Sequence, residues 1–200
     1  MSVAVLPFFI MERPVFVRER GNGFYGPISY AASNLFCCIP GVFIIALVSA
    51  ACVVLPSGLN GFGVYVAILG SSLFTAEAIM YLIASLVPHY IIGIALGAGL
   101  FGFHMLCEGF FIVEPDIPDW FIWGYYMGFH TYSFRAFMKN EFGPIDNFEG
   151  PQFSTGDDVL AFYGMQDAQL GRDIGITLAF GMFYFLCYTL ILQRFHTGKR

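Results

Sequence analysis

Long apolar stretches with almost no charge alternate with short polar breaks along most of this chain. A helix that crosses a membrane needs about 20 consecutive, predominantly apolar residues. The pattern therefore predicts four transmembrane helices, at residues 28–55, 62–86, 91–113 and 174–192. A proline lies inside the first of them, where a membrane helix tolerates it.

Two polar segments interrupt the apolar pattern. In the first, residues 11–26, three arginines alternate with glutamates around the apolar pair Val15 and Phe16, and Gly21 stands at its expected end. This arrangement predicts a short amphipathic helix at a membrane surface, with a solvated loop as the open alternative. Residues 1–10 are apolar but too short to cross a bilayer, so we expect them to end a preceding helix. The second segment, residues 114–173, carries ten acids against three bases.

The composition supports lipid as the solvent for most of the chain. Apolar residues make up 58% and charged residues 12% of the 200 positions, and the mean hydropathy is +0.71. The expected fold is therefore all-α and integral to a membrane, with membrane lipid as a partner. The net charge of −5 gives no basis for a nucleic-acid partner.

The distribution of basic residues predicts the orientation. Three arginines lie in residues 12–20, and the C-terminal tail carries Arg194, Lys199 and Arg200. Four spans place these two segments on the same side, which the positive-inside rule identifies as the cytoplasm. Both ends of the chain are then cytoplasmic, and the acidic segment 114–173 is an extracellular loop.

Motifs for catalysis, nucleotide binding and metal binding are not found in the sequence. It has no phosphate-binding loop, no nucleophile elbow and no zinc-ligand spacing, and its five cysteines all lie in apolar stretches. We therefore expect no catalytic residue, no metal and no enzyme activity of this chain alone. Two intramembrane acids, Glu77 and Glu108, stand out, because a carboxylate within a span is costly. A packing role and direct handling of a substrate or proton both remain open for them.

Several motifs, taken in their order along the chain, resemble one known family. They are Glu12-Arg13-Pro14-Val15-Phe16-Val17-Arg18-Glu19 with Gly23-Phe24-Tyr25-Gly26, Pro40, Ala84-Ser85-Leu86-Val87-Pro88, Gly109-Phe110-Phe111 with Asp116-Ile117-Pro118, and Phe134-Arg135-Ala136-Phe137 with Asn140-Glu141-Phe142. In this succession the chain resembles the transmembrane half of ABC transporters of subfamily G, the white–brown-complex type. The branch it resembles most is that of the plant-type lipid exporters.

The resemblance implies that residues 1–200 are part of a type-2 ABC exporter permease. They would hold the end of span two and spans three to six of six, with residues 11–26 as a cytoplasmic coupling helix and short helices in the outer loop. The ATP-binding domain, with its ATP and Mg²⁺, is absent from this chain. We expect a C-terminal fragment, or a subunit that pairs with a separate ATP-binding chain. A second permease half would complete a homodimer or heterodimer in the plasma membrane.

The resemblance also implies roles for individual residues. Ala98, Gly102 and Met105, spaced i, i+4 and i+7 on one helical face, match the substrate path. Phe110 and Phe111 match the apolar exit gate. Ordinary helix packing is the open alternative for these five residues. For contact with the ATPase domain, the expected residues are Phe16, Arg18 and Glu19.

The implied function is ATP-driven export of lipophilic molecules such as lipids or sterols. Two other functions remain open: a proton-coupled secondary carrier or channel that uses Glu77 and Glu108, and a truncated membrane subunit without transport of its own. Glu108 also departs from the family, which usually has a small polar residue before the glycine of the Gly-Phe-Phe step.

Overall fold

The computed structural model describes residues 5–147 and 153–196, and within these ranges all regular secondary structure is helical. The predicted all-α fold class is thereby confirmed. A 3-10 turn at Glu114–Asp116 lies between α4 and α5. In chain order the helices are α1 (Val5–Gly21), α2 (Pro27–Ser57), α3 (Phe62–Leu86), α4 (Tyr90–Cys107), α5 (Ile122–Met127), α6 (Phe129–Phe142), α7 (Gly156–Phe162) and α8 (Leu170–Phe195).

Four of these helices, α2, α3, α4 and α8, are long and apolar enough to cross a membrane. Helix α3 has the range expected from the sequence. Helices α2 and α8 are longer than expected and span Pro27–Ser57 and Leu170–Phe195. Pro40 lies within α2 without ending it. Gly58 ends α2 instead: its φ of 63° is left-handed, and its N–H donates to the Val54 carbonyl.

Helix α4 is shorter than the sequence predicted. It ends at Cys107 rather than near residue 113. Glu108 is the C-cap, and Gly109 takes a φ of 96°, which favours glycine and turns the chain out of the helix. Gly109, Phe110 and Phe111 therefore follow the span instead of forming its last turn.

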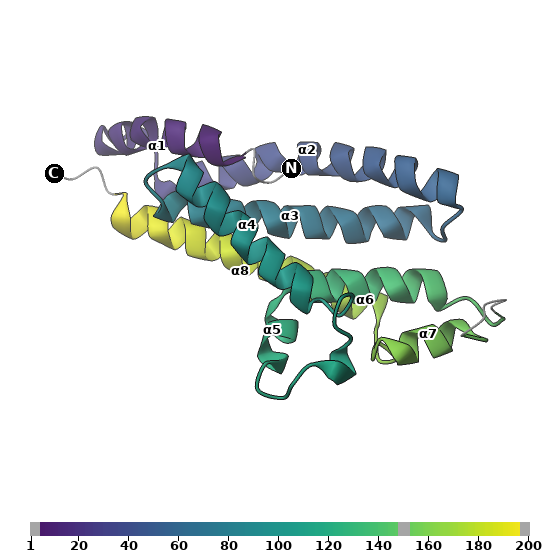
Figure 1. Ribbon diagram of the computed structural model, residues 1–200. Coiled ribbons are helices and arrows are strands. Elements are labelled where there is room, and N and C mark those ends of the chain that lie inside the picture. Colours follow the sequence, from purple (N-terminus) through teal and green to yellow (C-terminus); the bar gives the residue numbers. More distant parts are fainter. Residues whose placement is uncertain (1–4, 148–152, 197–200) are drawn as a thin grey trace.

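Helix α3 lies at the centre of the bundle and packs against α1, α2, α4, α6 and α8. The Thr75 hydroxyl of α3 donates to the Thr177 carbonyl of α8 at 2.8 Å. Helix α4 crosses obliquely over α3 (Figure 1). A Cβ on Gly97 would lie 2.8 Å from the Met80 side chain of α3, so the glycine permits this close crossing.

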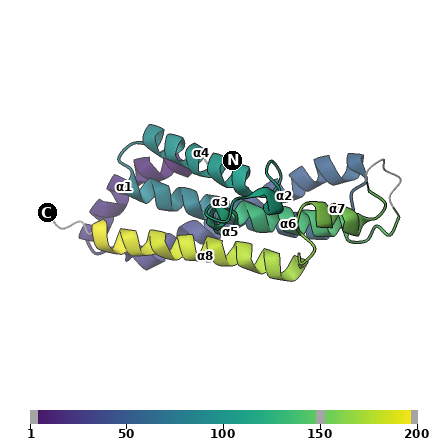
Figure 2. The same ribbon diagram turned by 60° about the horizontal axis from the view of Figure 1, so that its bottom comes forward.

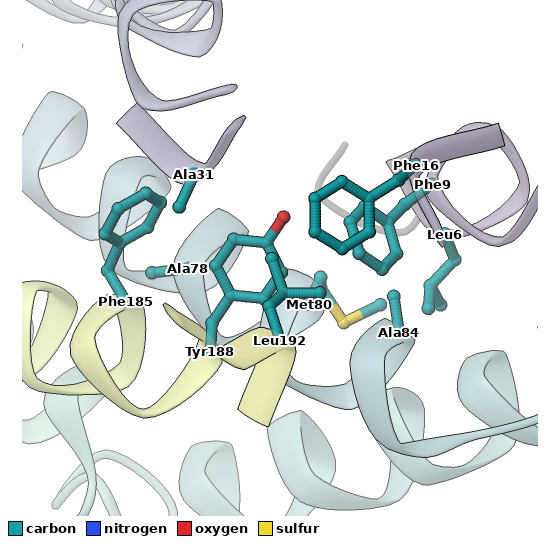
Figure 3. Packing of buried hydrophobic residues seen from close by; sticks show 10 residues of the cluster. All are labelled: Leu6, Phe9, Phe16, Ala31, Ala78, Met80, Ala84, Phe185, Tyr188 and Leu192. Carbon is teal, nitrogen blue, oxygen red and sulfur yellow. The ribbon is translucent and has the colours of Figure 1, made fainter. Parts of the chain in front are cut away.

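Residues 5–21 form one continuous helix, α1, that runs through Pro14. The predicted division into the tail of a span and a separate helix at 11–26 is therefore wrong. Its buried side chains Leu6, Phe9 and Phe16 point toward α3 and α8, where Tyr188 and Leu192 complete the core (Figure 3). This shared core fixes α1 as a single unit, because both halves of the helix bury aromatic side chains in it.

The segment 114–173 is more than a loop with short helices. Its longest helix, α6, packs along α3 and α8, at the end of the molecule away from α1 (Figure 2). Asn140 on α6 donates to the Asn60 carbonyl at 2.7 Å, and the Glu141 carboxylate accepts from the Asn60 N–H at 2.9 Å. Helix α6 is thus fastened to the turn between α2 and α3.

Candidate functional site

One face of α4 is left open by the rest of the chain. Ala98, Gly102 and Met105 lie on it, and all three are exposed. The opposite face carries the buried residues Gly97 and His104, which pack toward the bundle. The three predicted path residues therefore share a surface of small side chains and one flexible thioether, free of charge.

The chain beyond α4 places two phenylalanine rings at the end of this face. Phe110 and Phe111 are each about half exposed, and their ring centroids are 5.1 Å apart at an interplanar angle of 81°. Gly109 holds them there: its backbone is buried, and a Cβ at that position would lie 3.0 Å from Met165 and 3.1 Å from Tyr125. We call Phe110 and Phe111 the phenylalanine pair.

Helices α6 and α7 lie next to the phenylalanine pair. Phe110 contacts Phe134 of α6 edge-on, with ring centroids 5.8 Å apart. Behind it is an apolar pocket of about 380 Å³ between α6 and α7, lined by Met138, Val159 and Tyr163 among others. A change in the position of α6 would therefore move the support of Phe110.

Helix α6 is held to the start of α8 by a group of four charged side chains, two of them buried. The Arg135 guanidinium lies 2.6 Å from an Asp167 oxygen and 3.7 Å from an Asp173 oxygen. Arg172 approaches both carboxylates at 3.3 Å. Asp173 is fully buried and Arg135 nearly so, whereas Asp167 is exposed. Burial raises the pKa of Asp167, but the two arginines outweigh it and hold that pKa below its ordinary value.

Tyr125, His104 and His130 also have buried polar atoms, and His130 lies on α6 with Arg135. Burial raises the pKa of the Tyr125 hydroxyl to about 12, against the opposing effect of Arg135. His104 of α4 and His130 of α6 have ring centroids 5.8 Å apart, and both Nδ1 atoms are buried without a hydrogen-bond partner among the described residues. Burial, together with His104, lowers the pKa of His130 to about 4, so this ring is uncharged at neutral pH.

The two acids singled out from the sequence lie on different helices and have different surroundings. Glu77 is half-buried on α3 and faces Cys38 of α2 and Tyr81. Glu108 caps α4, and burial is the only cause that raises its pKa, to about 7.

The three residues expected to contact an ATPase domain point in different directions. Phe16 is 1% exposed and stacks on Tyr30 at 4.4 Å, so its side chain anchors α1 in the chain's own core. The Glu19 carboxylate accepts a hydrogen bond from the Tyr25 hydroxyl. Only Arg18 of the three is exposed. Phe8, Met11 and Val15 are large apolar side chains of α1 that are exposed.

Two other arginines of α1 tie it to the ends of α3 and α8. Arg13 Nη1 donates to the Val87 carbonyl at 2.7 Å, and Arg20 Nη1 donates to the Leu192 and His196 carbonyls at 2.6 and 2.9 Å. The last carbonyls of a helix lack partners within it, so these arginines cap α3 and α8. They also place the two basic ends of the chain at the same end of the bundle.

The resemblance pointed to Ala98, Gly102 and Met105 and to the phenylalanine pair, and all five residues are exposed in the structure. Sequence reasoning did not find the roles of Arg13, Arg20 and Arg135. In the sequence, Arg135 and Asp173 can be recognised as charged residues beside apolar helices. No local pattern indicates that the two form a pair. Among residues 5–147 and 153–196 there is no group of three or more side chains able to hold a metal ion.

Comparison with known proteins identifies relatives over most of the chain. Residues 1–142 match the family model described as "ABC-2 type transporter". ABC transporter G family member 1 of Petunia hybrida is 30% identical over 96% of this chain and 31% of its own length. ABC transporter G family member 11 of Arabidopsis thaliana is 36% identical over 91% of this chain and 27% of its own length. The chain thus spans about a third of the length of the curated relatives it matches.

Proposed function

The chain belongs to the ABC-2 type transporter family as a subfamily G membrane domain, and from this premise we propose that it forms part of one permease half of an ATP-driven exporter. A role in membrane transport follows from the family itself. The proposal adds an ATP-binding domain, on the same longer chain or on a separate subunit, that supplies ATP and Mg²⁺ chemistry. It also adds a second permease half, identical or different, opposite this one.

The observation that carries the proposal is the open face of α4. Ala98, Gly102 and Met105 are exposed on a helix long and apolar enough to cross a membrane, and the phenylalanine pair lies at the end of that helix. A second half placed against this face would enclose an uncharged space. Small residues leave room there for a bulky apolar molecule, and Met105 adapts to its shape.

The phenylalanine pair would act as the exit gate of that space. Two aromatic rings on each half can exclude water when they meet and part when substrate passes. Phe134 on α6 supports Phe110, so displacement of α6 relative to α4 would open the gate. The expected substrates are lipophilic, such as lipids or sterols, because Ala98, Gly102 and Met105 offer no hydrogen-bonding or charged side chain.

Helix α1 would pass movement from the ATP-binding domain to the bundle. Its exposed side chains, Met11, Val15 and Arg18, provide the contact surface, while the buried Phe16 fixes the helix in place. Arg13 and Arg20 bind the ends of α3 and α8, so a push on α1 would reach both spans together. The proposal therefore has α1 and both chain ends on the cytoplasmic side, and the resemblance implies the plasma membrane.

The test is transport by the full-length protein with its ATP-binding domain, reconstituted in liposomes with a fluorescent lipid. We expect ATP-dependent export in the parent, and raised leak with reduced coupling to ATP in Phe110→Ala and Phe111→Ala. Phe183→Ala is the matched control, since Phe183 is equally exposed but lies on α8. Transport that follows a proton gradient and ignores ATP depletion would refute the proposal in favour of a secondary carrier.

A further inference from the structure

We propose that a pocket between α1 and the C-terminal ends of α3 and α8 binds the headgroup of an anionic phospholipid. The pocket has a volume of about 520 Å³. Its lining includes Arg13, Leu86, Pro88, Ile191, Phe195 and His196. None of these belongs to the open face of α4, so the inference does not depend on the proposed export function.

The polar side of the pocket offers hydrogen-bond donors and positive charge. Arg13 uses three N–H groups on the carbonyls of Ala84, Val87 and Pro88. A guanidinium has five, so two N–H groups are left for a further acceptor. Arginine is well suited to phosphate oxygens, because its planar fork can donate two parallel hydrogen bonds. No acidic side chain lines the pocket.

The apolar side of the pocket is shaped for the upper part of a lipid chain. Leu86 and Phe195 are 62% and 75% exposed, although each stands at the end of a membrane-spanning helix. Ile191 lies one turn before Phe195 and continues this wall toward the membrane interior. The ends of spans lie at the depth of the lipid headgroups, so a bound lipid would place its phosphate and its chains against matching surfaces.

The surrounding charge favours an anionic lipid over a zwitterionic one. Arg18, Arg20 and Arg194 lie at the same end of the bundle, and Lys199 and Arg200 follow in the sequence. The acids of α1 are Glu12, which is exposed, and Glu19, which accepts a hydrogen bond from Tyr25. Basic pockets between membrane helices bind anionic headgroups, and each nearby Lys or Arg contributes about 1 kcal/mol.

The test is lipid binding by the full chain, purified in detergent with any partner chain that it retains. Native mass spectrometry follows its titration with phosphatidic acid and, separately, phosphatidylcholine. We expect a lipid adduct with phosphatidic acid at concentrations where phosphatidylcholine gives none. Arg13→Gln should weaken this binding about fivefold, which corresponds to the loss of one interfacial charge. Arg18→Gln removes the same charge from the same helix outside the pocket and should weaken it less.

A second pair of variants decides the question if Arg13→Gln does not fold. Ile191→Trp fills the pocket and should remove the adduct, whereas Leu190→Trp adds the same bulk to an exposed position outside it. Equal binding of both lipids, or an unchanged adduct in Ile191→Trp, would overturn the proposal. So would competition by glycerol 3-phosphate as strong as that by the lipid, because the site would then bind a soluble phosphate.

Discussion

Replacing Arg135 with methionine tests how α6 is held against the last span. Methionine keeps the length and apolar character of the arginine stem but removes its charge. Asp173 then remains fully buried, with Arg172 at 3.3 Å and the Gln169 N–H at 3.2 Å as its remaining partners. Removing one partner of a buried ion pair costs about 3–5 kcal/mol. Because Asp173 keeps these two partners, we expect a loss of about 2–3 kcal/mol.

The assay is thermal unfolding of the full chain in detergent, followed by tryptophan fluorescence. Trp120 and Trp123 are the only tryptophans, and both lie just before α6. In a chain of 150–250 residues, 1 kcal/mol shifts Tm by about 2–4 °C, so Arg135→Met should lower it by about 5–10 °C. Asp173→Leu should cause a similar loss, because the exposed Asp167 is then the carboxylate left to pair with the nearly buried Arg135.

The double variant Arg135→Met, Asp173→Leu separates charge pairing from packing. Replacing a buried ion pair by apolar residues of similar volume is often neutral, so the double variant should lose less stability than the two single variants together. The expected interaction energy between the two sites is about 1–3 kcal/mol. A double variant whose loss equals the sum of the two single losses would refute the reasoning, since the two residues would then act independently.

Three further predictions concern Glu108, Gly109 and Phe16. Burial raises the pKa of Glu108 from 4.5 to about 7. Between these two pH values the folded chain keeps the Glu108 proton, whereas the unfolded chain has released it. Stability should therefore fall as pH rises from about 4.5 to 7, by at most about 3 kcal/mol, and Glu108→Gln should flatten this profile in Tm against pH. Gly109→Ala should lower the free energy of unfolding by about 1–3 kcal/mol in the same assay, because Gly109 has a φ of 96°. Gly99→Ala is the control, since Gly99 is helical and no atom lies within 4 Å of an added Cβ. Equal effects of the two substitutions would contradict a backbone cause. Phe16→Ala should destabilise the chain by about 3–5 kcal/mol. Phe8 is 71% exposed on the same helix, so Phe8→Ala should be near neutral. A stable Phe16→Ala chain would show that α1 is not anchored by its core face.

The effect of Phe16→Ala bears on the proposed coupling. Loss of transport in that variant would follow from a displaced α1, without any contact between Phe16 and an ATP-binding domain. Variants of the exposed positions Met11 and Val15 are the informative ones for that contact. They change the outer surface of α1 and leave its core unaltered.

The sequence alone determined the membrane-spanning helices, because hydropathy over about 20 residues is a local property that lipid imposes on any span. It also predicted an apolar helix before the acidic segment and the placement of small residues on one face of α4. These features depend on residues close together in the chain. The length of α4 was overestimated, because apolar residues continue past Gly109 and only its left-handed φ ends the helix there.

Only the tertiary structure decided which segments far apart in the sequence contact one another. Arg20 reaches a carbonyl 172 residues away and Arg13 one 74 residues away, and no local pattern records such pairs. That α1 is one helix with Phe16 inward depends on the core offered by α3 and α8. The position of α6 depends in the same way on Arg135 and Asp173, which are 38 residues apart in sequence. The resemblance pointed to the residues of the α4 face and the phenylalanine pair, but the exposure of that face and the contact of Phe110 with α6 depend on how distant segments pack.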